Sequence, residues 1–155
     1  MADHQTGVPG CSVILSDPAE TEAFAADFSD RLSVGDVVAL SGDLGAGKTV
    51  FARALIQARA RKMGHAVDHV PSPTYTLVQV YELPGGIIHH FDLYRLEDPN
   101  DAWELGIEEA FASGISLIEW GERIDGLLPA KTLRLMFEFG DGDSRRVLSI
   151  LEPLQ

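Results

Sequence analysis

One eight-residue stretch constrains this chain more than any other feature of its sequence. It reads Gly42-Asp43-Leu44-Gly45-Ala46-Gly47-Lys48-Thr49 and matches the pattern G-x-x-x-x-G-K-[ST]. In this pattern the glycines let backbone N–H groups wrap a phosphate, the lysine reaches the β- and γ-phosphates, and the hydroxyl coordinates Mg²⁺. Lys48 is one of only three lysines in the chain, which favours a phosphate-binding loop over an ordinary glycine-rich turn.

The residues on either side of the loop fit the same interpretation. Val37-Val38-Ala39-Leu40 is a continuous apolar run, typical of a strand that is covered on both faces. After the loop, a helix is predicted from residue 48 or 49 to about Met63, with basic residues in its last turn and Gly64 just beyond. This order of elements aims the positive N-terminal end of the helix at the bound anion.

The rest of the chain predicts an α/β fold. We expect strands at 12–15, 115–118, 132–139 and 145–151, and a hairpin of 74–82 with 87–93. Helices are expected after Asp17 and over 99–112, and a short helix or turn at 124–128. We therefore predict a single P-loop NTPase-like domain, with a mixed parallel and antiparallel sheet and helices on its faces. Residues 1–10 are predicted to be a flexible N-terminal tail, and residues 11–155 the domain.

Composition narrows the class of protein. The 155 residues carry a formal net charge of −12, which disfavours stand-alone binding to nucleic acid or to an anionic membrane. The single cysteine, Cys11, excludes an internal disulfide and a CxxC-type zinc site. The sequence has no apolar run of about 18 residues and no secretion signal at its N-terminus, so we expect a cytoplasmic protein without a membrane partner.

The sequence also favours one nucleotide base. Guanine-specific P-loop proteins usually carry an Asn/Thr-Lys-x-Asp element. The only asparagine here, Asn100, is followed by Asp101, and no lysine follows a threonine. An adenine nucleotide is therefore predicted by exclusion.

A magnesium ion at such a loop needs a carboxylate at the end of a neighbouring strand. Glu119 follows Ile115-Ser116-Leu117-Ile118, a stretch typical of a buried strand, and Asp92 follows 87–91, so the residues alone leave both candidates open. His89 and His90 alternate across a strand and therefore cannot both face one metal ion. We expect these imidazoles to be packed or solvated.

Four segments taken together resemble the TsaE (YjeE) family of small bacterial P-loop ATPases. They are the phosphate loop, Pro71-Ser72-Pro73-Thr74-Tyr75-Thr76-Leu77-Val78, His90-Phe91-Asp92-Leu93-Tyr94-Arg95-Leu96 and Ile118-Glu119-Trp120. The resemblance covers about residues 12–150. It implies ATP and Mg²⁺ as cofactors, and a role in making threonylcarbamoyladenosine beside the anticodon of certain tRNAs. The implied partners are TsaD-like and TsaB-like proteins, with tRNA contacted only indirectly through their complex.

The resemblance also implies residue roles. The catalytic set would be Lys48, Asp92 and Glu119, with Thr49 and Glu119 holding Mg²⁺ and Asp92 close to the metal and its water. The nucleotide would be bound by the phosphate loop together with Thr21, Thr74, Trp120, Glu122 and Arg123. Thr74 would belong to a switch-like loop over the γ-phosphate and Trp120 to a second one. Thr21 ends a stretch, Asp17 to Thr21, that would lie beside the base.

These observations predict a Mg²⁺-dependent ATPase that is slow alone and activated by its partners. Two alternatives stay open at this point, a small-molecule kinase and a non-catalytic nucleotide-binding adaptor. A kinase usually needs a lid that contributes several arginines. The nine arginines of this chain are scattered along the sequence, which disfavours that alternative.

Overall fold

The computed structural model describes residues 12–142 and 146–151, so the predicted tail 1–10 lies outside the described residues. Seven strands form one sheet in the order β1-β7-β6-β2-β5-β4-β3. The strands are β1 (Ser12–Leu15), β2 (Val37–Gly42), β3 (Val78–Leu83), β4 (Gly86–Asp92), β5 (Gly114–Glu119), β6 (Leu133–Phe139) and β7 (Arg146–Leu151). The helical elements are α1 (Pro18–Ser29), α2 (Lys48–Lys62), the 3₁₀ helices η2 (Pro99–Leu105) and η3 (Gly121–Leu127), and α3 (Ile107–Ser113).

The sheet is mixed, as the sequence predicts. Strand β2 pairs in parallel with β5 and with β6, and β4 pairs in parallel with β5. The antiparallel pairs are β1 with β7, β6 with β7, and β3 with β4. Because β2, β4 and β5 run in one direction, their carboxyl ends meet at one edge of the sheet, where ligands of open α/β sheets bind. The register places Asp92 and Leu40 on either side of Glu119.

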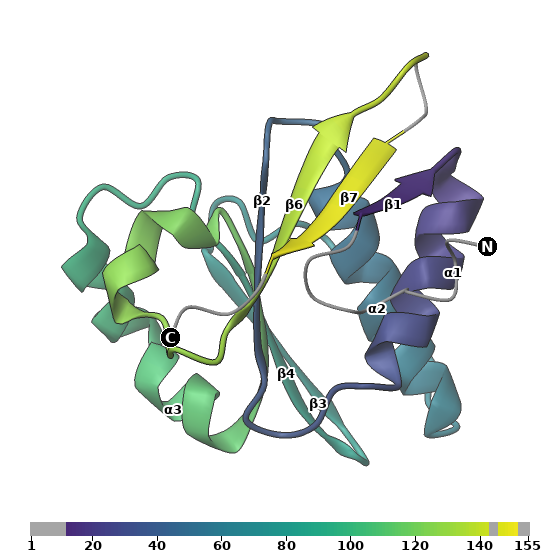
Figure 1. The fold of residues 1–155 in the computed structure, drawn as a ribbon. Coiled ribbons are helices and arrows are strands. Elements are labelled where there is room, and N and C mark those ends of the chain that lie inside the picture. The colour runs from purple at the N-terminus through teal and green to yellow at the C-terminus, as the bar shows by residue number, and fades with distance from the viewer. Residues whose placement is uncertain (1–11, 143–145, 152–155) are drawn as a thin grey trace.

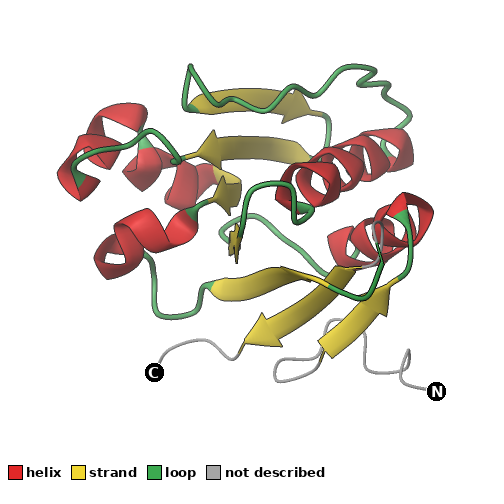
Figure 2. Cartoon of the chain, turned by 90° about the horizontal axis from the view of Figure 1, so that it is seen from above, coloured by secondary structure: helices red, strands yellow, loops and turns green. Residues whose placement is uncertain are grey.

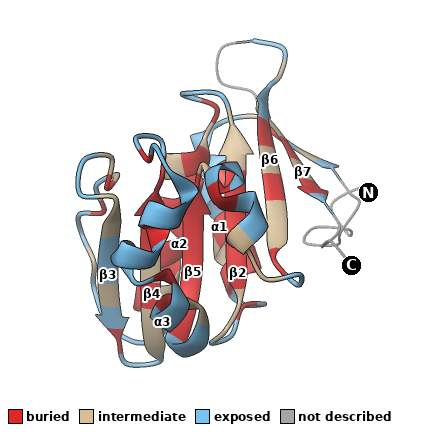
Figure 3. Ribbon diagram, turned by 90° about the vertical axis from the view of Figure 1, so that its left-hand side faces the viewer, coloured by how far each residue is buried: buried red, intermediate tan, exposed pale blue. Residues whose placement is uncertain are grey.

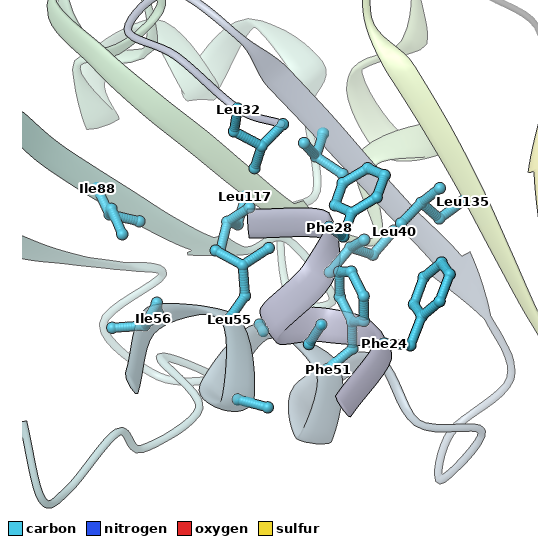
Figure 4. Close-up of a cluster of buried hydrophobic side chains, with 14 of the residues drawn as sticks. Phe24, Phe28, Leu32, Leu40, Phe51, Leu55, Ile56, Ile88, Leu117 and Leu135 are labelled. Atoms are coloured by element: carbon cyan, nitrogen blue, oxygen red, sulfur yellow. The ribbon is translucent and has the colours of Figure 1, made fainter. Parts of the chain in front are cut away.

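Helices cover both faces of the sheet. Helices α1 and α2 lie on one side, and α3 with the two 3₁₀ helices lies on the other (Figure 1, Figure 2). Each face has its own core. On the α1–α2 side, the rings of Phe24, Phe28 and Phe51 contact one another (Figure 4). Phe51 also contacts the ring of Phe137, and the ring centroids of these four pairs are 5.5–6.0 Å apart. In the described ranges, no helix combines the length and the apolar character needed to cross a membrane.

The central strands are the most deeply buried part of the fold (Figure 3). All six residues of β5 and the first four of β2 are buried. A parallel strand with helices on both faces has no solvent side, which is why 37–40 is a continuous apolar run and 115–118 is apolar except for the buried Ser116. The prediction made from these two stretches is confirmed.

The prediction of one continuous helix over 99–112 is wrong. The chain forms η2 and then α3, with Gly106 between them at φ 81°. A residue in this left-handed region ends one helical unit before the next begins. Trp103 on η2 is 47% exposed, whereas Ile107 and Ala110 on α3 are fully buried.

The first strand of the predicted hairpin is also shorter than expected. It begins at Val78 rather than at Thr74, because the residues before it form a turn. The N–H of Leu77 donates to the carbonyl of Pro73 at 2.7 Å, and Leu77 itself has φ 72°. The carbonyl of Leu77 accepts from the N–H of Asp92 at 3.0 Å, so this turn is fastened to the end of β4.

His89 on β4 predicts a pH dependence of folding. Burial lowers the pKa of His89 below its ordinary value of 6.5, with Glu109 acting weakly in the opposite direction. The unfolded chain then binds the proton more readily, so stability is lost as the pH falls through about 6.5. We expect His89→Gln to lose less stability than the wild type between pH 7.5 and 5.5, measured as urea midpoints. An equal loss in both proteins would contradict the assignment to His89.

Candidate functional site

A cavity of about 280 Å³ opens where β2, β4 and β5 end. The phosphate loop, the start of α2, the turn before β3 and the ends of β4 and β5 all contribute to its wall. The lining residues are Leu44, Gly45, Gly47, Lys48, Thr49, Val50, Ser72, Thr74, Asp92, Tyr94, Glu119 and Trp120. The structure therefore brings the predicted catalytic and metal-binding residues together in one place.

The shape of the phosphate loop depends on its glycines. Gly42, Gly45 and Gly47 have φ values of 136°, 80° and 119°, which other residues rarely adopt. A Cβ on Gly42 would lie 2.3 Å from the carbonyl oxygen of Phe137 on β6, closer than any real contact. Gly47 precedes α2 without a side-chain capping bond, so the first N–H groups of that helix are left for another acceptor such as an anion.

Two neighbouring strands hold the loop in place. Phe137 packs close to Gly42 and Gly47, and the guanidinium of Arg146 on β7 donates to the carbonyl of Gly45 at 3.2 Å. Ala46, in the middle of the loop, is fully buried. The loop is thus part of the packed fold.

Lys48 is held inside the site. Its Nζ donates to the carbonyl of Gly42 and, at 3.0 Å, to that of Asp43, and it lies 4.2 Å from the centre of the Trp120 ring. Burial lowers the pKa of Lys48, while Glu119, Glu122, Asp92 and Asp43 act to raise it. A cation this poorly solvated interacts strongly with an anion that enters the cavity.

The structure distinguishes the two carboxylates that the sequence left open. Glu119, 2% exposed, accepts a hydrogen bond from the Thr49 hydroxyl through Oε1 at 2.7 Å. Asp92, 4% exposed, accepts instead from the hydroxyls of Ser72 and Thr74 at 2.8 and 3.1 Å, and from the N–H of Tyr94 at 3.0 Å. Glu119 is therefore adjacent to the Thr49 hydroxyl, which was predicted to bind Mg²⁺, and Asp92 is bonded to the turn before β3.

The donor set fits a magnesium ion. Within the described ranges, no three or more His, Cys, Asp or Glu side chains are grouped closely enough to hold a metal by themselves. Magnesium does not require such a cage, because it is commonly bound by one or two carboxylates, water and the phosphates of a substrate. The hydroxyl of Thr49 and the carboxylate of Glu119 are hard oxygen ligands of that kind.

Six of the predicted nucleotide-binding residues do not line the cavity, three within the phosphate loop (Gly42, Asp43 and Ala46) and three outside it. Thr21 is buried on α1, and Glu122 and Arg123 lie on η3. The Arg123 guanidinium lies 5.8 Å from the centre of the Tyr94 ring and 5.9 Å from that of Trp120, at the edge of the site. Their roles toward the nucleotide stay predictions.

Sequence reasoning missed other residues of the site. Ser72 and Tyr94 line the cavity, and the fully buried His90 places its Nε2 2.6 Å from Oε2 of Glu119. A signal for His90 was present, because alternation along β4 puts residues 90 and 92 on one face of the sheet.

Comparison with known proteins agrees with this geometry. A family model described as "Threonylcarbamoyl adenosine biosynthesis protein TsaE" matches residues 15–147. The chain belongs to the TsaE family. The TsaE protein of Rickettsia bellii is 40% identical over 132 residues, covering 85% of this chain and 89% of that protein. The TsaE protein of Haemophilus influenzae is 44% identical over 112 residues, covering 72% of this chain and 67% of that protein.

A solved structure confirms the fold class. The crystal structure of YdiB from Bacillus subtilis matches with a TM-score of 0.72 at 28% identity, covering 92% of this chain and 84% of that one. The fold is that of a P-loop NTPase-like domain. Membership of the TsaE family places the chain in tRNA threonylcarbamoyladenosine biosynthesis. Together, family and fold indicate a nucleotide-binding protein that works with the modification machinery.

Proposed function

We propose that this TsaE protein binds ATP with Mg²⁺ and hydrolyses it in the cytoplasm, on a complex of TsaD-like and TsaB-like proteins that modifies tRNA. The observation that carries the proposal is the convergence of a buried cation and a hydroxyl–carboxylate pair in one cavity. Lys48 and the Thr49–Glu119 pair meet there at the N-terminus of α2. Cation, helix terminus and hard oxygens are the groups that a nucleoside triphosphate with its metal requires.

Each group has a distinct task in this proposal. The backbone N–H groups of the loop and of α2 bind phosphate oxygens, and Lys48 exchanges its two carbonyl contacts for the anion. A magnesium ion held by Thr49 and Glu119 would neutralise charge on the transferred phosphate. Asp92 anchors the Ser72 and Thr74 hydroxyls beside the cavity, so that the turn is placed to sense the terminal phosphate.

The same geometry bears on the two alternatives. Among the described residues that line the cavity, Lys48 is the only cationic side chain, so no arginine lid of a small-molecule kinase is assembled there. A kinase would pass labelled γ-phosphate to an acceptor, whereas an ATPase passes it only to water. A binding adaptor would support tRNA modification equally well with a non-hydrolysable analogue of ATP. Both alternatives are therefore decided in a reconstituted modification reaction.

Nucleotide choice gives the direct test of binding. We expect ATP or ADP with Mg²⁺ to raise the melting temperature more than GTP does, because no guanine-reading element is present. At a concentration of about 100 times Kd, the bound nucleotide adds about 2.7 kcal/mol to the free energy of unfolding. Lys48→Ala is the control and should show a smaller shift with ATP. Equal or larger stabilisation by GTP would overturn the adenine assignment.

A further inference from the structure

The carboxylate of Glu119 is held from two sides. Oε1 accepts from Thr49, and Oε2 lies 2.6 Å from Nε2 of His90. The register explains the second contact: His90 on β4 is paired with Leu117 on β5, so its ring reaches diagonally along the same face to the residue two positions further on. His90 is 0% exposed and Glu119 is 2% exposed, which keeps solvent from competing for this hydrogen bond.

The chemistry of the pair gives the direction of the hydrogen bond. An ionised carboxylate only accepts, so the Nε2–H of His90 must donate to it. In the described part of the chain, the other ring nitrogen, Nδ1, has no hydrogen-bond partner. On this face, Ile88 and Leu117 are apolar and buried, whereas the neighbouring Asp92 is bonded to Ser72, Thr74 and Tyr94. In the ranges described, Gln79, the polar partner of His90 on β3, is not hydrogen-bonded to the ring. Among the described residues, Glu119 is therefore the only side chain that this imidazole hydrogen-bonds.

We propose that His90 is a positioning residue for Glu119. By holding Oε2, it fixes the last torsion of the glutamate, which is otherwise broad, and turns Oε1 toward the Thr49 hydroxyl where the metal would bind. The inference rests on the proposed function, because it assumes that Thr49 and Glu119 hold Mg²⁺. Hydrogen-bond partners of metal ligands typically change metal affinity by roughly 10–100-fold when they are removed.

A purely structural role for His90 makes a different prediction. If the ring only filled space in the core, any substitution of similar polarity would act through stability alone. Two amide substitutions of His90 distinguish a positioning role from a structural one. The side-chain nitrogen of glutamine occupies the place of Nε2, whereas that of asparagine occupies the place of Nδ1. His90→Gln can therefore still donate to Glu119, and His90→Asn cannot. His89→Asn is the matched control, since the adjacent His89 projects from the opposite face of β4.

The measurement is the dependence of ADP affinity on MgCl₂, followed by calorimetry. We expect His90→Asn to raise the Mg²⁺ concentration at the midpoint by roughly 10–100-fold. His90→Gln should stay close to the wild type, His89→Asn should not differ from it, and ADP affinity in EDTA should be the same in all four proteins. An unchanged midpoint in His90→Asn, or an equal rise in His90→Gln, would overturn the positioning role.

Two further results distinguish a failure of the His90 role from a failure of the proposed Mg²⁺ site. If Mg²⁺ does not affect ADP affinity in the wild type, the metal role of Thr49 and Glu119 is wrong, and the inference falls with it. If His90→Asn does not fold, nitrogen NMR of the wild-type imidazoles decides the matter. A proton on Nε2 of His90 supports the assignment, and a proton on Nδ1 alone overturns it.

Discussion

Glu119→Gln is expected to lower ATP hydrolysis by roughly 10²–10³-fold within the active complex, while most of the nucleotide affinity is kept. The substitution preserves the shape of the side chain and removes the negative charge beside the Thr49 hydroxyl. The phosphate loop, Lys48 and the helix terminus remain to bind the nucleotide. The measurement compares single-turnover hydrolysis with ADP affinity in the same preparation.

Lys48→Ala is the contrasting variant for that experiment. It removes the only cationic side chain among the described residues that line the cavity, so nucleotide affinity itself should fall. The two variants thus separate charge used for binding from charge used for the reaction. Hydrolysis at the wild-type rate by Glu119→Gln in the active complex would contradict the metal role of Glu119.

The isolated chain is expected to hydrolyse ATP slowly, and a TsaD–TsaB-like complex to accelerate it by on the order of 10³-fold or more. An arginine placed on the transferred phosphate is worth this much in related chemistry. Within the described structure, Arg123 stays at the rim, beside the rings of Tyr94 and Trp120. A partner can supply the missing charge, or it can order the turn that carries Thr74.

The turn before β3 is exposed to solvent at Tyr75, so a partner protein can contact it. Tyr75, next to Thr74, is 79% exposed, with the guanidinium of Arg95 4.3 Å from the centre of its ring. The measurement is steady-state hydrolysis by the chain alone, with the partner complex, and with the complex plus tRNA. A fast rate from the purified chain that no partner changes would contradict partner activation and favour a self-sufficient hydrolase or kinase.

Sequence predicts those parts of the site in which the identity of a residue is required by its own backbone conformation or by its own chemical role. The phosphate loop was predictable because each of its positions has a local requirement, such as the positive φ of Gly42 and Gly47. The residues alone could not show which of Asp92 and Glu119 contacts Thr49, because that depends on the packing of two adjacent parallel strands. The family resemblance favoured Glu119, and the structure bonds Glu119 to the Thr49 hydroxyl. His90 could have been found by applying the alternation of β4 to Asp92.

The errors in the fold have a common physical origin. Leu77 adopts φ 72°, a conformation that leucine rarely takes and that its identity does not indicate. Gly106 does permit a left-handed turn, yet a single glycine inside an apolar helical pattern is also compatible with a continuous helix. In both places tertiary contacts determine the backbone: Leu77 is bonded to Asp92, and Ile107 enters the core just after Gly106.

The phosphate loop is held in shape by residues that are translated long after the loop itself. Phe137 of β6 packs against the backbone of Gly42, and Arg146 of β7 reaches the carbonyl of Gly45. Strand β7 also pairs with β1, so the first and last described strands are neighbours. A nascent chain that has grown only as far as β5 carries the whole motif but lacks the strands that fix its shape. We therefore expect the loop to take its final shape late in synthesis, after most of the domain has been translated.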